Sequence, residues 1–294
     1  PDNVVVTYAP ITADLLHAGD SPPSRRSPYM RLLGPYLEKK PHVVIRDYIP
    51  GFLTGLFVPE PDVANLAVDI PLYRKLGIRG MAREGRKAFM QTWISYYINA
   101  KLLWDAGADV DALKRDFYDT FFGPESGRHV QAWWDACEAV LRDSTTQAHE
   151  DFLVNHLYTR RFTDAIHRHV EAARAATTTP EQRERVTAFA LIAENLECYA
   201  AMHESEQGLD YPAAAGFADR MVAIKEELQA IDSFLISPDP RERKHFAKGW
   251  STRLKRLATL GDGTRGERVV SLSRRMRFAR DPFNAGVIER WYRP

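Results

Sequence analysis

The feature that most constrains this chain is a change of pattern after its first hundred residues. Three short runs rich in β-branched and other apolar residues come first, separated by helix-patterned segments. The expected strands are residues 4–9, 42–48 and 78–84, and the expected helices are residues 28–40 and 62–76. This alternation favours a parallel sheet with right-handed crossovers. Strands that are mostly apolar are typical of a sheet covered on both faces.

From residue 86 onward the pattern is helical. Apolar residues recur at helical spacing in segments 86–104, 110–122, 127–142, 151–176, 181–205, 213–234 and 241–259. Gly123 is a helix stop, and Thr179 followed by Pro180 is a helix start. Amphipathic segments of this kind pack as antiparallel helices in a bundle. A short strand-like run begins at Val269.

The pattern divides the chain into three expected domains, so that the fold class is α/β plus all-α. Residues 1–108 are expected to be the C-terminal part of a (β/α)8 barrel of the TIM type, because strands about 35 residues apart suit such a barrel. Residues 109–262 form a helical domain, and residues 263–294 contain a linker and the strand-like run. Because the chain begins with Pro1 and has no signal-peptide pattern, we expect it to be a piece of a longer polypeptide.

Composition excludes several kinds of partner. Forty basic against thirty-nine acidic side chains leave a formal charge of +1, which gives no overall attraction to nucleic acid or to an anionic membrane. No apolar run reaches the length of about 18 residues that a membrane span needs. Cys137 and Cys198 lie in helix-patterned segments and are expected to be buried free thiols.

Motifs for cofactors or metals fail in their context. Residues 261–266 match a glycine-rich dinucleotide fingerprint, but they follow a helix and precede a strand, whereas a pyrophosphate site needs the start of a helix. The pairs His149-Glu150 and His203-Glu204 lack the second histidine of a zinc helix. We therefore expect no cofactor and no metal.

Two of the expected strands end in a carboxylate. Asp47 ends one and shares its face with Ile45, while Glu84 ends the next and shares its face with Ala82. If both faces line the mouth of a barrel, the two acids converge where barrel enzymes keep their chemistry. Glycoside hydrolysis uses a carboxyl pair, so we predict Glu84 as base or nucleophile and Asp47 as its partner. Each acid also suits an ordinary loop after a strand.

Further side chains are candidates for substrate binding. A helix that begins soon after Glu84 carries several aromatic residues, and aromatic faces suit the apolar faces of sugar rings. Such residues also suit a helical core. The predicted substrate contacts are His17, Tyr48, Trp93 and Tyr97.

Several stretches resemble the bacterial DUF4838 family. They are residues 9–17, 45–48, 73–85 and 96–105, and the similarity covers residues 1–135. Members of this family look like large glycoside-hydrolase-type proteins, related in layout to α-glucuronidases and to β-hexosaminidase-like barrels. The resemblance implies that Asp47 and Glu84 occupy positions like the acid pair that activates water. The acid that protonates the leaving group would lie on an earlier strand.

The end of the chain carries a second part of this resemblance. Residues 276–286, with Glu289 and Trp291, resemble the entry into a β-sandwich. Residues 263–294 would then be a linker and the first strand of a truncated β-sandwich. The resemblance also implies a parent protein that is secreted or periplasmic.

Three functions follow as hypotheses. The first is a glycoside hydrolase that acts on a poly- or oligosaccharide, with activity expected in the parent protein rather than in this chain alone. The second is a non-catalytic carbohydrate-binding protein, and the third is a helical interaction module. The expected partners are a carbohydrate and the rest of the same polypeptide, with no nucleic acid and no membrane.

Overall fold

A computed structural model describes residues 4–10, 14, 16–22, 26–39, 42–48, 58–83, 89–145, 155–236 and 247–261. The contacts divide the chain into two compact units, Pro1–Ala258 and Thr259–Pro294. Residues 259–261 are the described part of the second unit, so the expected β-sandwich strand lies outside the described residues. The predicted segment 1–108 shares the first unit with residues 109–258.

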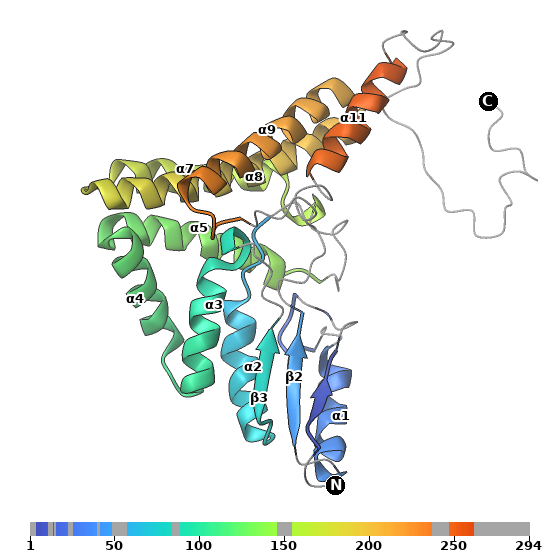
Figure 1. The fold of residues 1–294 in the computed structure, drawn as a ribbon, viewed down its shortest axis with the longest axis vertical. Coiled ribbons are helices and arrows are strands. Elements are labelled where there is room, and N and C mark those ends of the chain that lie inside the picture. Colours follow the sequence, from blue (N-terminus) through green and yellow to red (C-terminus); the bar gives the residue numbers. More distant parts are fainter. Residues whose placement is uncertain are drawn as a thin grey trace, which may run out of the picture. The chain divides into compact units, whose positions relative to one another are not determined.

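The first part of the chain forms a small parallel sheet in the order β1-β2-β3 (Figure 1). Its strands are β1 Val6–Tyr8, β2 Val43–Asp47 and β3 Gly80–Arg83, and the helices between them are α1 Arg26–Lys39 and α2 Val63–Lys75. Both pairs of neighbouring strands run parallel. The predicted β-α-β-α-β order and the parallel sheet are therefore confirmed.

One face of the sheet packs against α1 and α2. Leu33 of α1, Ile45 of β2 and Tyr73 of α2 form a buried apolar cluster on this face. The strand register aligns Tyr8 with Ile45 and Ile45 with Met81, so these residues point the same way. Right-handed crossovers place successive helices on the same face of a parallel sheet, which explains why both helices lie here.

The opposite face is largely open among the described residues. Thr7, Arg46 and Ala82 are exposed there, and Val44 and Gly80 between them are half-buried. The expectation of a sheet covered on both faces is therefore wrong for the described part of the chain. Parallel sheets normally have both faces covered, so an open face is unusual for this kind of sheet.

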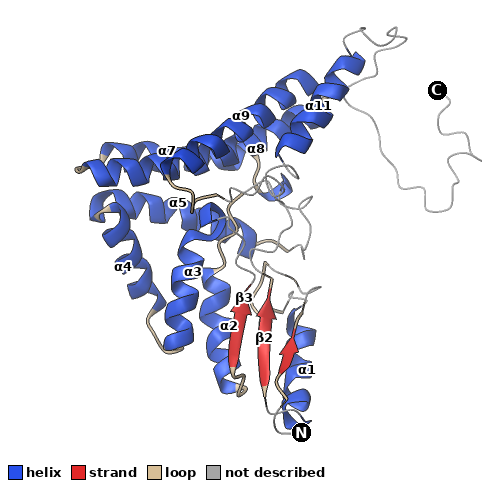
Figure 2. Ribbon diagram, in the orientation of Figure 1, coloured by secondary structure: helices blue, strands red, loops and turns tan. Residues whose placement is uncertain are grey.

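The described residues from 89 onward are mainly helical (Figure 2). The helices are α3 Phe89–Trp104, α4 Val110–Phe122, α5 Pro124–Arg142, α7 Arg160–Ala175, α8 Pro180–Gln207, α9 Tyr211–Ile231 and α11 Ala247–Gly261. They match the seven predicted segments, with ends shifted by up to nine residues, the largest shift being at the start of α7. None of the described helices has the length and apolar character needed to cross a membrane.

Local signals determine several helix ends. The Asp109 side chain accepts hydrogen bonds from two backbone N–H groups at the start of α4, and Thr179 accepts one from Gln182 at the start of α8. Gly123 has a φ of 82°, which favours glycine. A Cβ at this position would also lie 2.3 Å from the side-chain nitrogen of Gln182, so the end of that flexible side chain would have to move.

A continuous apolar core joins the helices and reaches α2. Its centre is aromatic, with the ring of Trp133 5.2 Å from that of Trp134 and 5.4 Å from that of Phe189, both edge-to-face. Cys137 and Cys198 are buried free thiols, as predicted. Since residues of α2 and α3 belong to the same core as those of α4 and α5, the sheet and the helices are not separated at residue 108.

Candidate functional site

Asp47 lies at the carboxyl end of β2 and is 5% exposed. Its Oδ2 lies 3.3 Å from Nε of Arg83, the residue aligned with it at the end of β3. Its Oδ1 accepts a hydrogen bond of 2.9 Å from the backbone N–H of Tyr48. Both carboxylate oxygens of Asp47 therefore contact groups within the protein.

Arg83 links two buried carboxylates. Its Nη2 donates to Oδ2 of Asp62 at 2.5 Å, in addition to the contact with Asp47, and all three side chains are buried. Removing one member of such a buried group leaves an uncompensated charge, so each member depends on the others. We call Asp47, Asp62 and Arg83 the Arg83 cluster.

Other polar side chains near the Arg83 cluster come from the segment before α2 and from α3. Glu60 is buried, and Tyr96 of α3 is half-buried. Burial raises the pKa of Tyr96, and the charges of Asp62 and Glu60 act in the same direction. The nearby Thr92 side chain and the charge of Arg83 oppose this rise. The carboxyl end of the sheet is thus a buried polar region.

Glu138 of α5 reaches the same region from a distant part of the sequence. Its Oε1 accepts a hydrogen bond of 2.7 Å from the backbone N–H of Ala64 in the first turn of α2. Asp62, the residue before α2, makes no side-chain capping bond. Glu138 therefore satisfies one of the free N–H groups at the start of this helix.

Burial raises the pKa of Glu138 to about 7, although the hydrogen bond from Ala64 and the charge of Lys114 lower it. Asp62 and Asp135 add to the rise. Sequence analysis missed Glu138 because its position in an amphipathic helix gives no sign of a partner 74 residues away.

The structure separates the two faces on which the acid pair was expected. Asp47 points to the helix-covered face together with Arg83, whereas Ala82 is aligned with Arg46 on the open face. Asp47 and Ala82 therefore lie on opposite faces, because the register aligns Asp47 with Arg83 rather than with a residue of the Ala82 face. The predicted convergence of Asp47 with Glu84 stays a prediction. Glu84 itself lies outside the described residues.

His17 is buried and holds two segments together. Its Nδ1 lies 2.6 Å from Oδ2 of Asp14, and its Nε2 lies 2.7 Å from the carbonyl oxygen of Ser144. Because a carbonyl oxygen only accepts, Nε2 carries a hydrogen and donates it. With both nitrogens occupied, His17 connects the segment after β1 to the end of α5. Because both ring nitrogens contact groups of the protein, His17 does not fit its predicted role as a substrate contact.

Trp93 and Tyr97 lie on α3 but face the helices. Trp93 is 1% exposed and packs edge-to-face against Phe122 at 5.5 Å, so it offers no ring face to a ligand. The Tyr97 hydroxyl donates to Oδ2 of Asp116 at 2.5 Å, and its ring lies 5.4 Å from Phe117 of α4. Trp93 and Tyr97 are four residues apart and so lie on the same face of α3, which packs against α4. Both predicted substrate contacts are therefore packed into the helical region.

Tyr48 is the aromatic candidate that stays near the open face. It follows Asp47, is half-buried, and its ring centre lies 5.9 Å from the guanidinium carbon of Arg46. Arg46 is exposed on the open face. Tyr48 and Arg46 are thus neighbouring groups at the end of β2.

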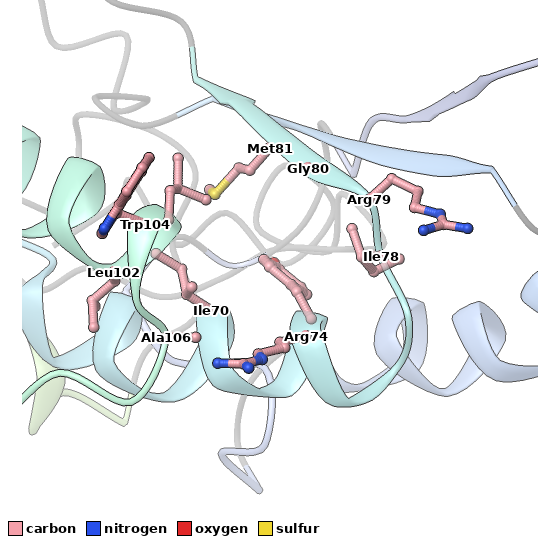
Figure 3. Close-up of a pocket in the computed structure, with 11 residues that line it drawn as sticks. Ile70, Arg74, Ile78, Arg79, Gly80, Met81, Leu102, Trp104 and Ala106 are labelled. Atoms are coloured by element: carbon pink, nitrogen blue, oxygen red, sulfur yellow. The ribbon is translucent and has the colours of Figure 1, made fainter.

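A cavity of about 220 Å³ lies beside β3 (Figure 3). It is lined by the first residues of this strand, Gly80 and Met81, whereas Arg83 is the last. Its walls come from α2, β3 and the end of α3, and include Ile70, Gly80, Met81 and Leu102. Trp104 at its border is 94% exposed. Since β3 is an edge strand of the described sheet, the cavity adjoins an open sheet edge.

The described residues contain no group of three or more histidine, cysteine or acidic side chains arranged to hold a metal ion.

The candidate site lies in the part of the chain that matches a protein-family model. Searches of curated proteins and of solved structures gave no match. The matched part of the chain contains the sheet, the Arg83 cluster and the cavity, and ends within α5. Residues 1–135 match DUF4838, a domain of unknown function, which confirms the resemblance over this part of the chain.

Proposed function

We propose that residues 1–108 supply part of a (β/α) barrel of the glycoside-hydrolase type and that the open face of the sheet belongs to its carbohydrate site. The parent protein would act on a poly- or oligosaccharide. It would be secreted or periplasmic, and the end of the chain would lead into a β-sandwich.

The observation that supports the barrel is the open edge of β3. The cavity of about 220 Å³ adjoins this edge, and Leu103 and Trp104 at its border are exposed apolar residues. A further parallel strand in this position would pair with β3 and cover these side chains. A sheet that continues in this way, with its helices on one face only, has the arrangement of a barrel wall.

In a barrel the face opposite the helices becomes the interior. On the described part of this face Thr7, Arg46 and Ala82 are exposed. Strand alternation in the sequence predicts that Glu84, two residues after Ala82, follows on the same face. We therefore retain Glu84 as the candidate base or nucleophile.

In this proposal Asp47 has a different role from the predicted one of partner to Glu84 in catalysis. Its carboxylate faces the helices and contacts Arg83, the residue directly before Glu84. It is therefore a positioning residue, which holds the end of β3 through Arg83. Tyr48 and Arg46, near the open face, are the candidate substrate contacts.

The chemistry follows from a carboxyl pair. A carboxylate at Glu84 would activate water or attack the anomeric carbon, while a protonated acid on another strand would donate its proton to the leaving oxygen. Preorganised ion pairs such as the Arg83 cluster keep a neighbouring group in place during such a step.

Carbohydrate binding without cleavage is the second candidate function. It is favoured by the described part of the open face, where Arg46 is present and no carboxylate is found. Arg46 and Tyr48 would then hold a glycan through hydrogen bonds and ring contact, with no residue to break the glycosidic bond.

The test measures glycan binding and hydrolysis separately. The full chain and a longer natural polypeptide that includes it are applied to a glycan array, and release of reducing sugar is measured for every glycan bound. Glu84→Gln should abolish hydrolysis and leave binding within about threefold. Glu125→Gln, at an exposed position of α5, is the matched control and should change neither.

Binding without hydrolysis in all wild-type proteins would support the second function. Neither binding nor hydrolysis would contradict both.

A further inference from the structure

A histidine lies at the contact between α8 and α11. His203 of α8 is 7% exposed, and its ring centre lies 4.5 Å from that of Tyr199 and 5.1 Å from that of Trp250 in α11. Both rings meet it edge-on, with interplanar angles of 72° and 78°. Nε2 of His203 is buried and has no hydrogen-bond partner within the part of the chain that the structure describes.

Charged and titratable groups face His203 from three segments. Oε2 of Glu206, on the same helix, lies 3.9 Å from its Nδ1. Arg253 of α11 pairs with Glu206 and lies 4.5 Å from the Trp250 ring centre. His156 lies in the segment before α7. Glu206 favours the protonated imidazole, whereas Arg253 and His156 oppose it.

Other contacts attach α11 independently of His203. Ser251 Oγ donates to Oδ1 of Asp219 in α9 at 2.6 Å, and Lys255 Nζ donates to the same oxygen at 2.8 Å. Leu254 is fully buried in the apolar core. The attachment of α11 therefore includes the apolar contact of Leu254, two bonds to Asp219, the ion pair of Arg253 with Glu206, and the ring contact with His203.

We propose that His203 is a proton-sensitive latch, so that protonation of its imidazole weakens the attachment of α11 to α8. The neutral ring needs a donor hydrogen on only one nitrogen, so Nδ1 can donate toward Glu206 and Nε2 can remain a bare acceptor. The protonated ring has a donor on both nitrogens. Its Nε2–H would then be buried without an acceptor, between two aromatic rings.

The direction of the pH effect follows from burial. Burial is the main reason that the pKa of His203 falls from 6.5 to about 4 when α11 is in place. When α11 is detached, the ring reaches water and titrates near its ordinary pKa. The attached state is thus fully favoured above about pH 6.5, and its advantage decreases as pH falls toward 4.

The test follows hydrogen exchange of residues 247–261 in the full chain by mass spectrometry, at pH 7.5 and pH 5.0, after correction for intrinsic rates. In the wild type, the opening equilibrium of α11 should rise by about thirtyfold at pH 5.0, from the two pKa values and one tenfold change per unit. Exchange in α4 should stay unchanged.

His203→Phe keeps a ring between Tyr199 and Trp250 but removes the titration, so α11 should remain protected at pH 5.0. His167→Phe, at a half-exposed histidine of α7, is the control and should retain the wild-type response. If His203→Phe does not fold, His203→Gln provides the same comparison. Equal protection of wild-type α11 at both pH values, or an unchanged pH response in the His203 variants, would overturn the proposal.

Discussion

The sheet part of the molecule, β1 to β3 with α1 and α2, is held differently from the helical part, α3 to α9. In the described sheet part, the separate apolar cluster on the covered face is Leu33, Ile45 and Tyr73. The helical part has a large aromatic core, in which α8 is buried over much of its length. Burial of apolar area stabilises the helical part, whereas the described part of the sheet has an open face and an open edge.

The two parts also use charge differently. At the end of the sheet, Arg83 joins Asp47 and Asp62, and all three side chains are buried. On the helices, pairs such as Arg128 with Glu125 have both side chains 63% exposed. A buried ion group is costly to break, while an exposed pair contributes about 0–1 kcal/mol. The same residue types therefore contribute differently to the free energy of unfolding in the two parts.

The largest expected effect comes from the aromatic core. Trp133→Ala should lower the free energy of unfolding by about 4 kcal/mol, because the side chain is fully buried and leaves a cavity. Trp104→Ala, at the exposed border of the cavity beside β3, should change it by less than about 0.5 kcal/mol. Urea unfolding of both variants measures this. Equal losses would show that Trp104 is packed in solution.

The next effect tests the buried ion group. Arg83→Ala should cost about 3 kcal/mol, because two buried carboxylates lose their shared cation. Arg128→Ala removes an exposed pair and should cost less than about 0.5 kcal/mol. The measurement is again urea unfolding at constant pH and salt. A small loss for Arg83→Ala would mean that water reaches the Arg83 cluster.

A third prediction concerns pH and the link between the two parts. In the folded protein the pKa of Glu138 is raised to about 7. Its favourable contribution to the free energy of unfolding is therefore complete below about pH 4.5 and is lost as pH rises through 7. Glu138→Gln removes this dependence while its amide oxygen can still accept from Ala64. At pH 8 the variant should be more stable than the wild type by about 3 kcal/mol, from about 2.5 pKa units at about 1.4 kcal/mol each.

Chemical unfolding at pH 5 and pH 8 measures the Glu138 effect. Glu125→Gln, in the first turn of the same helix and exposed, is the control and should show the wild-type pH dependence. If Glu138→Gln follows the wild type at both pH values, the carboxyl is not titrating in this range.

The smallest expected effect is at a helix end. Thr179→Ala removes the hydrogen bond to the backbone N–H of Gln182 at the start of α8 and should cost about 1 kcal/mol. Thr187 lies inside the same helix and bonds back to the carbonyl of Arg183, so Thr187→Ala should be neutral or slightly stabilising. Thermal unfolding of both variants compares them. A larger loss for Thr187→Ala would contradict this assignment.

Much of the secondary structure was predictable because it depends on local spacing. The three strands, α1, α2 and the later helices follow from runs of neighbouring residues, and Thr179 and Gly123 signal helix ends directly. The helical core was also predictable in kind, as Trp93 and Trp133 show, but their partners were not. A periodic pattern identifies an apolar face without identifying the element that covers it.

The candidate site was less predictable. Asp47 was identified as the carboxylate at the end of a strand, but its contact with Arg83 depends on the register of β2 and β3. His17 was predicted to contact substrate, but its bond to Ser144 joins segments 127 residues apart, which no local pattern indicates. Strand alternation states which residues share a face, and the packing of helices decides which face becomes covered.

The sequence by itself determined the β-α-β-α-β order, the parallel direction of the strands and the long helical region, because these follow from local periodicity and short connections. Only the tertiary structure decided that Asp47 faces the helices, that Glu138 supports the start of α2, and that His203 meets Trp250. Each of these contacts joins residues far apart in the chain, and its formation depends on three-dimensional packing that no local pattern encodes.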